Sequence, residues 1–183
     1  MGILQTLAKF FRLSKREMKI LVIGLDNSGK TTIINYLKPE EKQVSYVVPT
    51  VGFNVEKVFV KPLSFTCFDM SGHTRYRNLW EHYYIECDAL IFVVDSCDHL
   101  RLCVARDELE QMLEHKMLCA RRIPLLIFAN KMDHGCALTA SKVAEALGLD
   151  QIRDKPWNIV ASNGITGQGI PEGMKWICDC LKS

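Results

Sequence analysis

The chain has 183 residues and a formal net charge of +2, which fits one domain with a hydrophobic core of ordinary size. It contains no run of about 18 apolar residues, so we expect no membrane-spanning helix, and the lack of a long apolar leader argues against secretion. The eight cysteines are scattered and form no C-x-x-C pair. We therefore expect a reduced, cytoplasmic protein without a zinc site.

Basic side chains are concentrated at the N-terminus. Residues 1–19 carry five of them against one acid, so the rest of the chain carries 18 basic and 20 acidic residues. A basic end on a nearly neutral body favours an anionic membrane surface as a partner and argues against nucleic acid.

The same segment has the pattern of an amphipathic helix. Its apolar residues recur at helical spacing and form a single stripe. This stripe consists of Ile3, Leu4, Leu7, Phe10 and Phe11. The opening M-G-I-L-Q-T fits the myristoylation pattern, with Gly2 as the acceptor. We predict a membrane helix at residues 1–16 and a compact domain at 17–183, with a helix packed permanently on that domain as the alternative.

The rest of the chain alternates between predicted strands and helices. A buried strand at Lys19–Gly24 leads through a glycine-containing loop into a helix at Lys30–Leu37. Two strands, Phe53–Val60 and Leu63–Asp69, are joined by the turn Lys61-Pro62, and this spacing permits only an antiparallel hairpin. Three further strands alternate with three helices: Leu90–Asp95, Arg101–Glu114, Pro124–Asn130, Thr139–Leu147, Trp157–Ser162 and Pro171–Leu181. We predict an α/β fold with a six-stranded, mostly parallel mixed sheet and helices on both faces.

The stretch G-L-D-N-S-G-K-T fits the phosphate-loop pattern G-x-x-x-x-G-K-[ST] between the first strand and the first helix. Small residues let backbone N–H groups surround phosphates, and the helix N-terminus adds positive charge. Lys30 is expected to reach the β- and γ-phosphates, and the Thr31 hydroxyl to ligate Mg²⁺. The predicted phosphate-binding residues are Gly24, Leu25, Asp26, Asn27, Ser28, Gly29, Lys30, Thr31 and Thr32. Asp26 is unusual, because a carboxylate near the γ-phosphate is unfavourable unless a water, a backbone donor or a partner holds it.

A second motif, N-K-M-D, follows a predicted strand at the sheet edge where ligands bind in this class of fold. The Asp133 carboxylate can accept hydrogen bonds from guanine N1 and N2, a pair that adenine lacks. Lys131 can lie over the base plane, while Asn130 can tie the neighbouring loops together. A backbone N–H of Asn163 or Gly164 is expected to meet guanine O6. These residues predict GTP and GDP, rather than ATP, as ligands.

These motifs, together with P-T-V-G-F, D-M-S-G and R-N-L-W-E-H-Y-Y, resemble those of the Arf and Arf-like small GTPases over nearly the whole chain. Within the family, L-D-N-S-G-K-T-T-I-I-N, F-D-M-S-G and D-K-P-W are most similar to the ciliary, Bardet–Biedl branch, which recruits the BBSome coat to membranes. Ser71 stands where most Arf proteins have glycine, and that branch shares the departure.

The resemblance implies a monomeric molecular switch. Thr50 is expected to sense the γ-phosphate and ligate Mg²⁺, Asp69 to bind Mg²⁺ through water, and the Gly72 N–H to meet the γ-phosphate. The N-terminal helix is expected to lie in a groove with GDP, and a shift in the register of the hairpin would release it onto a membrane with GTP. The implied partners are an exchange factor, a GTPase-activating protein and an effector coat. The implied location is the cytoplasm and the membrane surface of the cilium or its base.

Aromatic residues are concentrated around the predicted switch loops. Phe68 is expected to pack in the core. Phe53, Trp80 and Tyr84 are candidates for an apolar effector surface in the GTP state, with core packing as the alternative for Trp80 and Tyr84.

His73 stands where the resemblance implies a glutamine that orients the attacking water. A neutral imidazole also offers one donor and one acceptor, but on a rigid ring with a different reach. His73 is therefore the candidate catalytic residue, and we predict a small GTPase with slow intrinsic hydrolysis. A GTP-binding recruitment module with negligible hydrolysis stays open as the alternative, and the N-K-M-D motif disfavours an ATP-using phosphoryl-transfer enzyme.

Overall fold

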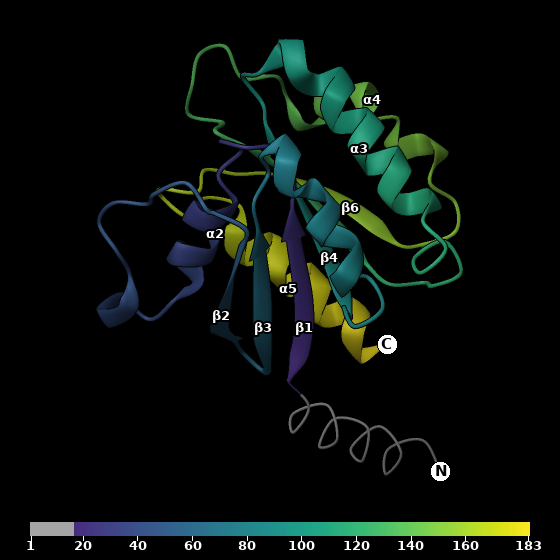
Figure 1. Ribbon diagram of the computed structural model, residues 1–183. Coiled ribbons are helices and arrows are strands. Elements are labelled where there is room, and N and C mark those ends of the chain that lie inside the picture. Colours follow the sequence, from purple (N-terminus) through teal and green to yellow (C-terminus); the bar gives the residue numbers. More distant parts are fainter. Residues whose placement is uncertain (1–16) are drawn as a thin grey trace, which may run out of the picture.

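The computed structural model describes residues 17–183 and folds them around one central sheet (Figure 1). The predicted amphipathic helix at residues 1–16 and the predicted acylation site at Gly2 lie outside the described residues. Within residues 17–183, no helix is both long enough and apolar enough to span a membrane.

The sheet has six strands in the order β2-β3-β1-β4-β5-β6. Their bounds are β1 (Met18–Ile23), β2 (Phe53–Val60), β3 (Leu63–Met70), β4 (Ala89–Asp95), β5 (Leu125–Asn130) and β6 (Trp157–Ala161). β2 runs antiparallel to β3, whereas every other neighbouring pair is parallel. The predicted α/β fold with a mixed, mostly parallel sheet is confirmed, and so is the antiparallel hairpin.

Helices cover both faces of the sheet, as predicted (Figure 1). Their bounds are α2 (Lys30–Leu37), α3 (Leu102–Glu114), α4 (Ala140–Ala146) and α5 (Ile170–Lys182). Alternate residues of each buried strand enter different cores, because successive side chains of a strand point to opposite faces. In β1, Ile20 and Val22 pack with α2 and α5, while Leu21 and Ile23 pack with α3 and α4.

Short 3₁₀ helices connect several of these elements. They are η1 (Glu40–Lys42), η2 (Thr74–Tyr83), η3 (His99–Arg101) and η4 (Leu149–Gln151). The sequence did not predict η2, because Trp80 is its one buried side chain and no apolar stripe marks it. α3 begins at Leu102 rather than Arg101, because η3 occupies the preceding turn.

The carboxyl ends of the parallel strands meet at one edge of the sheet, toward which the β1 arrow points in Figure 1. The phosphate loop follows β1, Asp69 lies next to the end of β3, and Asp95 and Asn130 end β4 and β5. Segments far apart in the sequence are thereby collected at the edge where ligands bind in open α/β sheets.

Candidate nucleotide-binding site

The phosphate loop can be built only with glycine at its two fixed positions. Gly24 has φ of 137°, and a Cβ there would lie 2.2 Å from the Val93 carbonyl oxygen. Gly29 has φ of 98°, and a Cβ there would lie 2.2 Å from the Asn130 side-chain nitrogen. Both positions combine a left-handed backbone with the close approach of another strand or loop. The loop can therefore pack closely against its neighbours while its backbone N–H groups remain available to a ligand.

The start of α2 is suited to an anion. Its first turn contains no acidic residue, and its N-cap makes no side-chain hydrogen bond to the helix. Lys30, at the first position, is buried and its Nζ donates to the Leu25 carbonyl oxygen at 2.7 Å. Burial lowers the pKa of Lys30 to about 8, against the opposing attraction of Asp69. A bound phosphate would therefore meet helix N–H groups and a lysine whose charged form it favours.

Three oxygen-bearing side chains converge beside this loop. The Thr31 hydroxyl donates to Asp69 Oδ2 at 2.7 Å and lies 2.9 Å from the Thr50 hydroxyl, which lies 3.4 Å from the same carboxylate oxygen. The other oxygen of Asp69, Oδ1, is buried and has no hydrogen-bond partner among the described residues. Burial raises the pKa of Asp69, and the bond from Thr31 opposes that rise.

This oxygen set fits Mg²⁺. The ion prefers hard oxygen ligands and retains several waters, so two hydroxyls and one carboxylate suit it, either directly or through water. The partnerless oxygen of Asp69 would gain a partner in the ion's hydration shell. Thr31, Thr50 and Asp69, predicted separately from three segments, are thus brought together by the fold.

A cavity of about 440 Å³ opens next to this cluster. It is lined by the phosphate loop, by residues 47–51 around Thr50, and by the segment after β3, including Gly72 and His73. Gly72 packs directly on the phosphate loop, where a Cβ would lie 2.2 Å from the Asp26 backbone nitrogen. The size and lining suit the polyphosphate part of a nucleotide.

His73 lies at the rim of that cavity, in the turn that precedes η2. Its backbone N–H donates to the Ser71 hydroxyl at 3.4 Å, and its exposed ring lies 6.4 Å from the Tyr76 ring, edge to face. The imidazole therefore reaches the same space as Thr50 and Lys30. Its catalytic role stays a prediction.

The base-side motif ties three loops together through Asn130. Its Nδ2 donates to the Ser28 carbonyl oxygen at 2.9 Å, and its Oδ1 accepts from the Gly164 N–H at 2.9 Å and from the Ser162 hydroxyl at 3.3 Å. The prediction that Asn130 joins the neighbouring loops is confirmed. It links the phosphate loop to both segments expected to surround the base.

The other predicted base contacts are made by Lys131, Asp133, Asn163 and Gly164, and they stay predictions. Lys131 has φ of 65°, and its Nζ pairs with Asp95 Oδ2 at 2.6 Å. Asp133 is exposed, as a contact with a bound base would require. The N–H groups of Asn163 and Gly164 donate to the Gln168 carbonyl oxygen and to Asn130, so a contact of either with guanine O6 would replace an existing bond.

Residues 3–181 match the family model described as the ADP-ribosylation factor family. The chain belongs to the ADP-ribosylation factor (Arf) family.

Individual Arf-family relatives are similar over nearly the whole chain. ADP-ribosylation factor-like protein 6 of Danio rerio is 54% identical over 183 residues, covering 100% of this chain and 98% of the relative. The Caenorhabditis elegans protein of the same name is 45% identical over 175 residues, covering 96% and 92%. A solved structure of the Arl6 BBS3 small GTPase from Trypanosoma brucei, with bound GppNp, has a TM-score of 0.84 and 45% identity. It covers 91% of this chain and 98% of its own.

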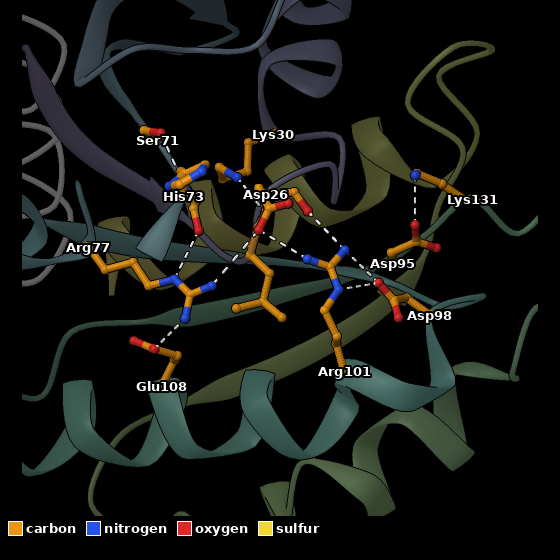
Figure 2. Close-up of polar contacts among 12 residues, drawn as sticks. Asp26, Lys30, Ser71, His73, Arg77, Asp95, Asp98, Arg101, Glu108 and Lys131 are labelled. Carbon is orange, nitrogen blue, oxygen red and sulfur yellow. Dashed lines mark hydrogen bonds and ion pairs between the residues drawn. The ribbon is translucent and has the colours of Figure 1, made fainter. Parts of the chain in front are cut away.

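Asp26 of this Arf-family domain has cationic partners that the sequence did not reveal (Figure 2). Arg101 Nη1 lies 3.0 Å from Asp26 Oδ1, and its Nη2 lies 2.6 Å from Asp98 Oδ2. Arg77 Nη2 lies 3.9 Å from the same Asp26 oxygen. The carboxylate is thus held by two guanidinium groups, which offsets its repulsion of a phosphate. Because these side chains are partly exposed, the pairs orient Asp26 more than they stabilise the fold.

Arg77 also connects two other parts of the domain (Figure 2). Its Nε donates to the Gly72 carbonyl oxygen at 2.9 Å, and its Nη1 pairs with Glu108 of α3 at 2.6 Å. Sequence reasoning missed Arg77, Arg101 and Glu108, because no local motif marks contacts between such distant segments.

The aromatic predictions need one correction. Trp80 and Tyr84 are only 2% and 5% exposed, so their assignment to an exposed effector surface is wrong for this conformation. Trp80 is fixed by a 3.0 Å bond from its Nε1 to the Ser71 carbonyl oxygen, and the Tyr84 ring packs edge-on against His115. Phe53 is 40% exposed and remains a candidate. Phe68 packs against the core, as expected.

Proposed function

We propose that this Arf-family protein is a guanine-nucleotide switch that uses Mg²⁺, binds membranes in its GTP state and recruits an effector coat there. The observation that carries the proposal is the convergence of Thr31, Thr50 and Asp69 beside the phosphate loop. Each of the three belongs to a different segment, and residues 47–51 around Thr50 line the cavity together with the phosphate loop.

The switch follows from what the side chains contact. Lys30 and the first turn of α2 hold the phosphates, while Thr31, Thr50 and Asp69 hold Mg²⁺, which would neutralise phosphate charge. The Thr50 loop and the Gly72 segment would each gain a contact with the γ-phosphate. Loss of that phosphate removes one contact from each loop, so both relax and an effector surface that includes Phe53 is lost.

Asn130, Lys131 and Asp133 provide the preference for guanine in this proposal. The bond from Asn130 to the phosphate loop fixes the base-side motif relative to the phosphates. Lys131 would exchange its pairing with Asp95 for a position over the base, or keep both. Asp133, exposed at the end of the motif and 3.8 Å from His134 Nε2, would accept from guanine N1 and N2.

For the cellular role, we propose recruitment of the BBSome at the cilium or its base, with an exchange factor and a GTPase-activating protein as further partners. The similarity to proteins named ADP-ribosylation factor-like protein 6, and to a structure whose name includes BBS3, supports this choice. The protein would be cytoplasmic and peripherally attached to membranes. Purified BBSome that binds the GDP-loaded and GTP-loaded chain equally well would argue against it.

Membrane attachment is proposed to depend on residues 1–16, released when the β2–β3 hairpin shifts its register along the sheet. Leu7→Asp, alone or with Phe11→Asp, should weaken binding of the GTP-loaded, acylated protein to anionic liposomes by at least about tenfold. Burying one leucine side chain contributes ~1.5–3 kcal/mol, so a charge on the apolar stripe removes much of the attachment. Co-sedimentation with liposomes measures the effect.

The matched control is Gln5→Asp, which adds the same charge opposite the stripe and should lower binding much less. Gly2→Ala should abolish acylation and reduce binding in both nucleotide states. Unchanged sedimentation of the paired stripe variant would assign the helix to permanent packing on the domain.

Slow hydrolysis is proposed because His73 replaces the glutamine usual in the family. His73→Gln should raise the rate of single-turnover GTP hydrolysis by about tenfold, equivalent to ~1.4 kcal/mol of barrier. The amide of glutamine can accept from the water while donating toward the transferring phosphoryl group, whereas the imidazole has a shorter, rigid reach. His82→Gln, an exposed change in η2 away from the cavity, is the control and should leave the rate unchanged.

The opposite ranking would show that His73 itself holds the water. In that case His73→Gln hydrolyses GTP more slowly than the wild type. If neither protein hydrolyses GTP measurably, the recruitment module with negligible hydrolysis is the correct description.

A further inference from the structure

Asp26 places an acidic side chain at the wall of the cavity that is expected to hold phosphates. The side chain is 47% exposed, so burial alone does not fix its orientation. A carboxylate at this position repels a phosphate unless a cation holds it, and GTP carries one more phosphate than GDP. The direction in which the Asp26 carboxylate points therefore bears on the preference between the two nucleotides.

Arg101 fixes that direction through two contacts with the same residue (Figure 2). Its Nη1 donates to Asp26 Oδ1 at 3.0 Å, and its Nη2 donates to the Asp26 carbonyl oxygen at 3.4 Å. The guanidinium is itself held by Asp98, whose Oδ2 accepts from Arg101 Nε at 2.6 Å. Because a guanidinium is planar and its donors have fixed directions, Arg101 orients the carboxylate relative to the phosphate loop.

Arg77 is a second cation near Asp26, but its contact is weaker. Its Nη2 lies 3.9 Å from Asp26 Oδ1, and other donors of the same guanidinium bind the Gly72 carbonyl oxygen and Glu108. Arg77 belongs to η2, next to a segment that the proposed switch moves, whereas Arg101 belongs to η3, before α3. Arg101 is therefore the partner that can remain on Asp26 in both nucleotide states.

The charges of Asp26 and its two cations also act on the lysine that is expected to bind the phosphates. Burial lowers the pKa of Lys30 to about 8, and Asp69 gives the largest opposing effect. Asp26 opposes the shift as well, whereas Arg77 and Arg101 lower the pKa further. A change in the balance between Asp26 and its cations would therefore change the electrostatic potential inside the phosphate site.

We propose that Arg101 is a positioning residue that sets the preference of the site for GTP over GDP, by holding the Asp26 carboxylate away from the γ-phosphate. This role rests on the proposed function, and it adds a specificity determinant that lies outside the nucleotide-binding motifs. Without Arg101, the carboxylate can turn into the cavity that it lines, where its charge opposes the additional phosphate of GTP.

The first experiment measures the affinities of Arg101→Gln for GDP and for GppNp, a GTP analogue that is not hydrolysed, by displacement of fluorescent GDP at saturating Mg²⁺. We expect the affinity for GppNp to fall by about tenfold, a modest effect for two charges near a protein surface. The affinity for GDP should change by about twofold or less, because GDP lacks the charge that Asp26 would repel. Arg106→Gln, which removes an exposed arginine of α3 paired with Glu110, is the control and should change neither affinity.

The second experiment separates the positioning of Asp26 from a purely structural role of Arg101. Asp26→Asn removes the repelling charge, so the double variant Asp26→Asn, Arg101→Gln should recover the wild-type preference for GppNp over GDP. Added salt should reduce the difference in GppNp affinity between Arg101→Gln and the wild type, because salt screens the repulsion. A double variant that binds GppNp as weakly as Arg101→Gln, or an equal loss of both nucleotides in Arg101→Gln, would overturn the proposal.

The wild type distinguishes failure of this role from failure of the proposed function. Wild-type protein that binds neither nucleotide would contradict the proposed function. Wild-type protein that binds both, together with an unchanged preference in Arg101→Gln, would overturn the role of Arg101 alone.

Discussion

Asp133→Asn is expected to lower the affinity for GTP by about 100-fold or more. The Asp133 carboxylate is proposed to accept two hydrogen bonds from guanine, and a bond to a charged group contributes about 1.5–3 kcal/mol. An amide offers one acceptor and one donor, so it matches xanthine, whose ring carries an oxygen where guanine has an amino group. Competition of GTP, xanthosine triphosphate and ATP against a fluorescent guanine nucleotide measures the change.

The informative result is that Asp133→Asn prefers xanthosine triphosphate, whereas the wild type prefers GTP. Asp150→Asn removes a carboxylate from another exposed position of the domain and should leave all affinities unchanged. Wild-type protein that binds ATP as tightly as GTP would remove the basis for the guanine assignment.

Thr31→Asn is the second change with a large expected effect. It displaces the hydroxyl that lies between Asp69 Oδ2 and the Thr50 hydroxyl, so it disturbs all three oxygen groups of the Mg²⁺ site. Because loss of even an outer-shell partner costs about 10–100-fold in metal affinity, we expect at least that loss for Mg²⁺. GTP should weaken more than GDP, since its additional phosphate charge requires the ion. Titration of both nucleotides at several Mg²⁺ concentrations measures this.

Thr50→Ala separates metal binding from sensing of the γ-phosphate. Thr50 belongs to the mobile part of the proposed switch, so its loss should weaken GTP while GDP affinity stays near that of the wild type. If Thr31→Asn binds GTP with unchanged Mg²⁺ dependence, or still recruits an effector like the wild type, Thr31 is not the ligand proposed here.

The fold and the phosphate loop could be predicted because their signals are local. Apolar runs such as those of β4 and β5 are buried on both sheet faces, and they are recognisable from composition alone. The fixed glycines and Lys30 of the loop are required by close backbone approach and by charge. Helix and strand bounds differ from those predicted by at most one residue, for example where Arg101 belongs to η3 and where Thr139 and Leu147 cap α4.

The remaining features depend on contacts between distant segments. Asp26 looks unfavourable in the sequence, because Arg101 and Arg77 come near it only after η3 and η2 are placed over the loop. Burial of Trp80 was likewise open, since an aromatic side chain in an irregular segment can face either way. Its bond to the Ser71 carbonyl oxygen decides the matter, and that bond exists only once β3 has been positioned.

Arg77 connects the Gly72 segment mechanically to α3. Its guanidinium is planar, with donors in fixed directions, and it holds the Gly72 carbonyl oxygen on one side and Glu108 of α3 on the other. Gly72 therefore cannot move away from the phosphate loop without breaking one of these bonds or pulling on α3. Coupling between two binding sites through such a connection is reciprocal. If binding of the γ-phosphate stabilises one arrangement of α3 and η2, then a molecule that binds and stabilises that arrangement must strengthen γ-phosphate binding by the same free energy.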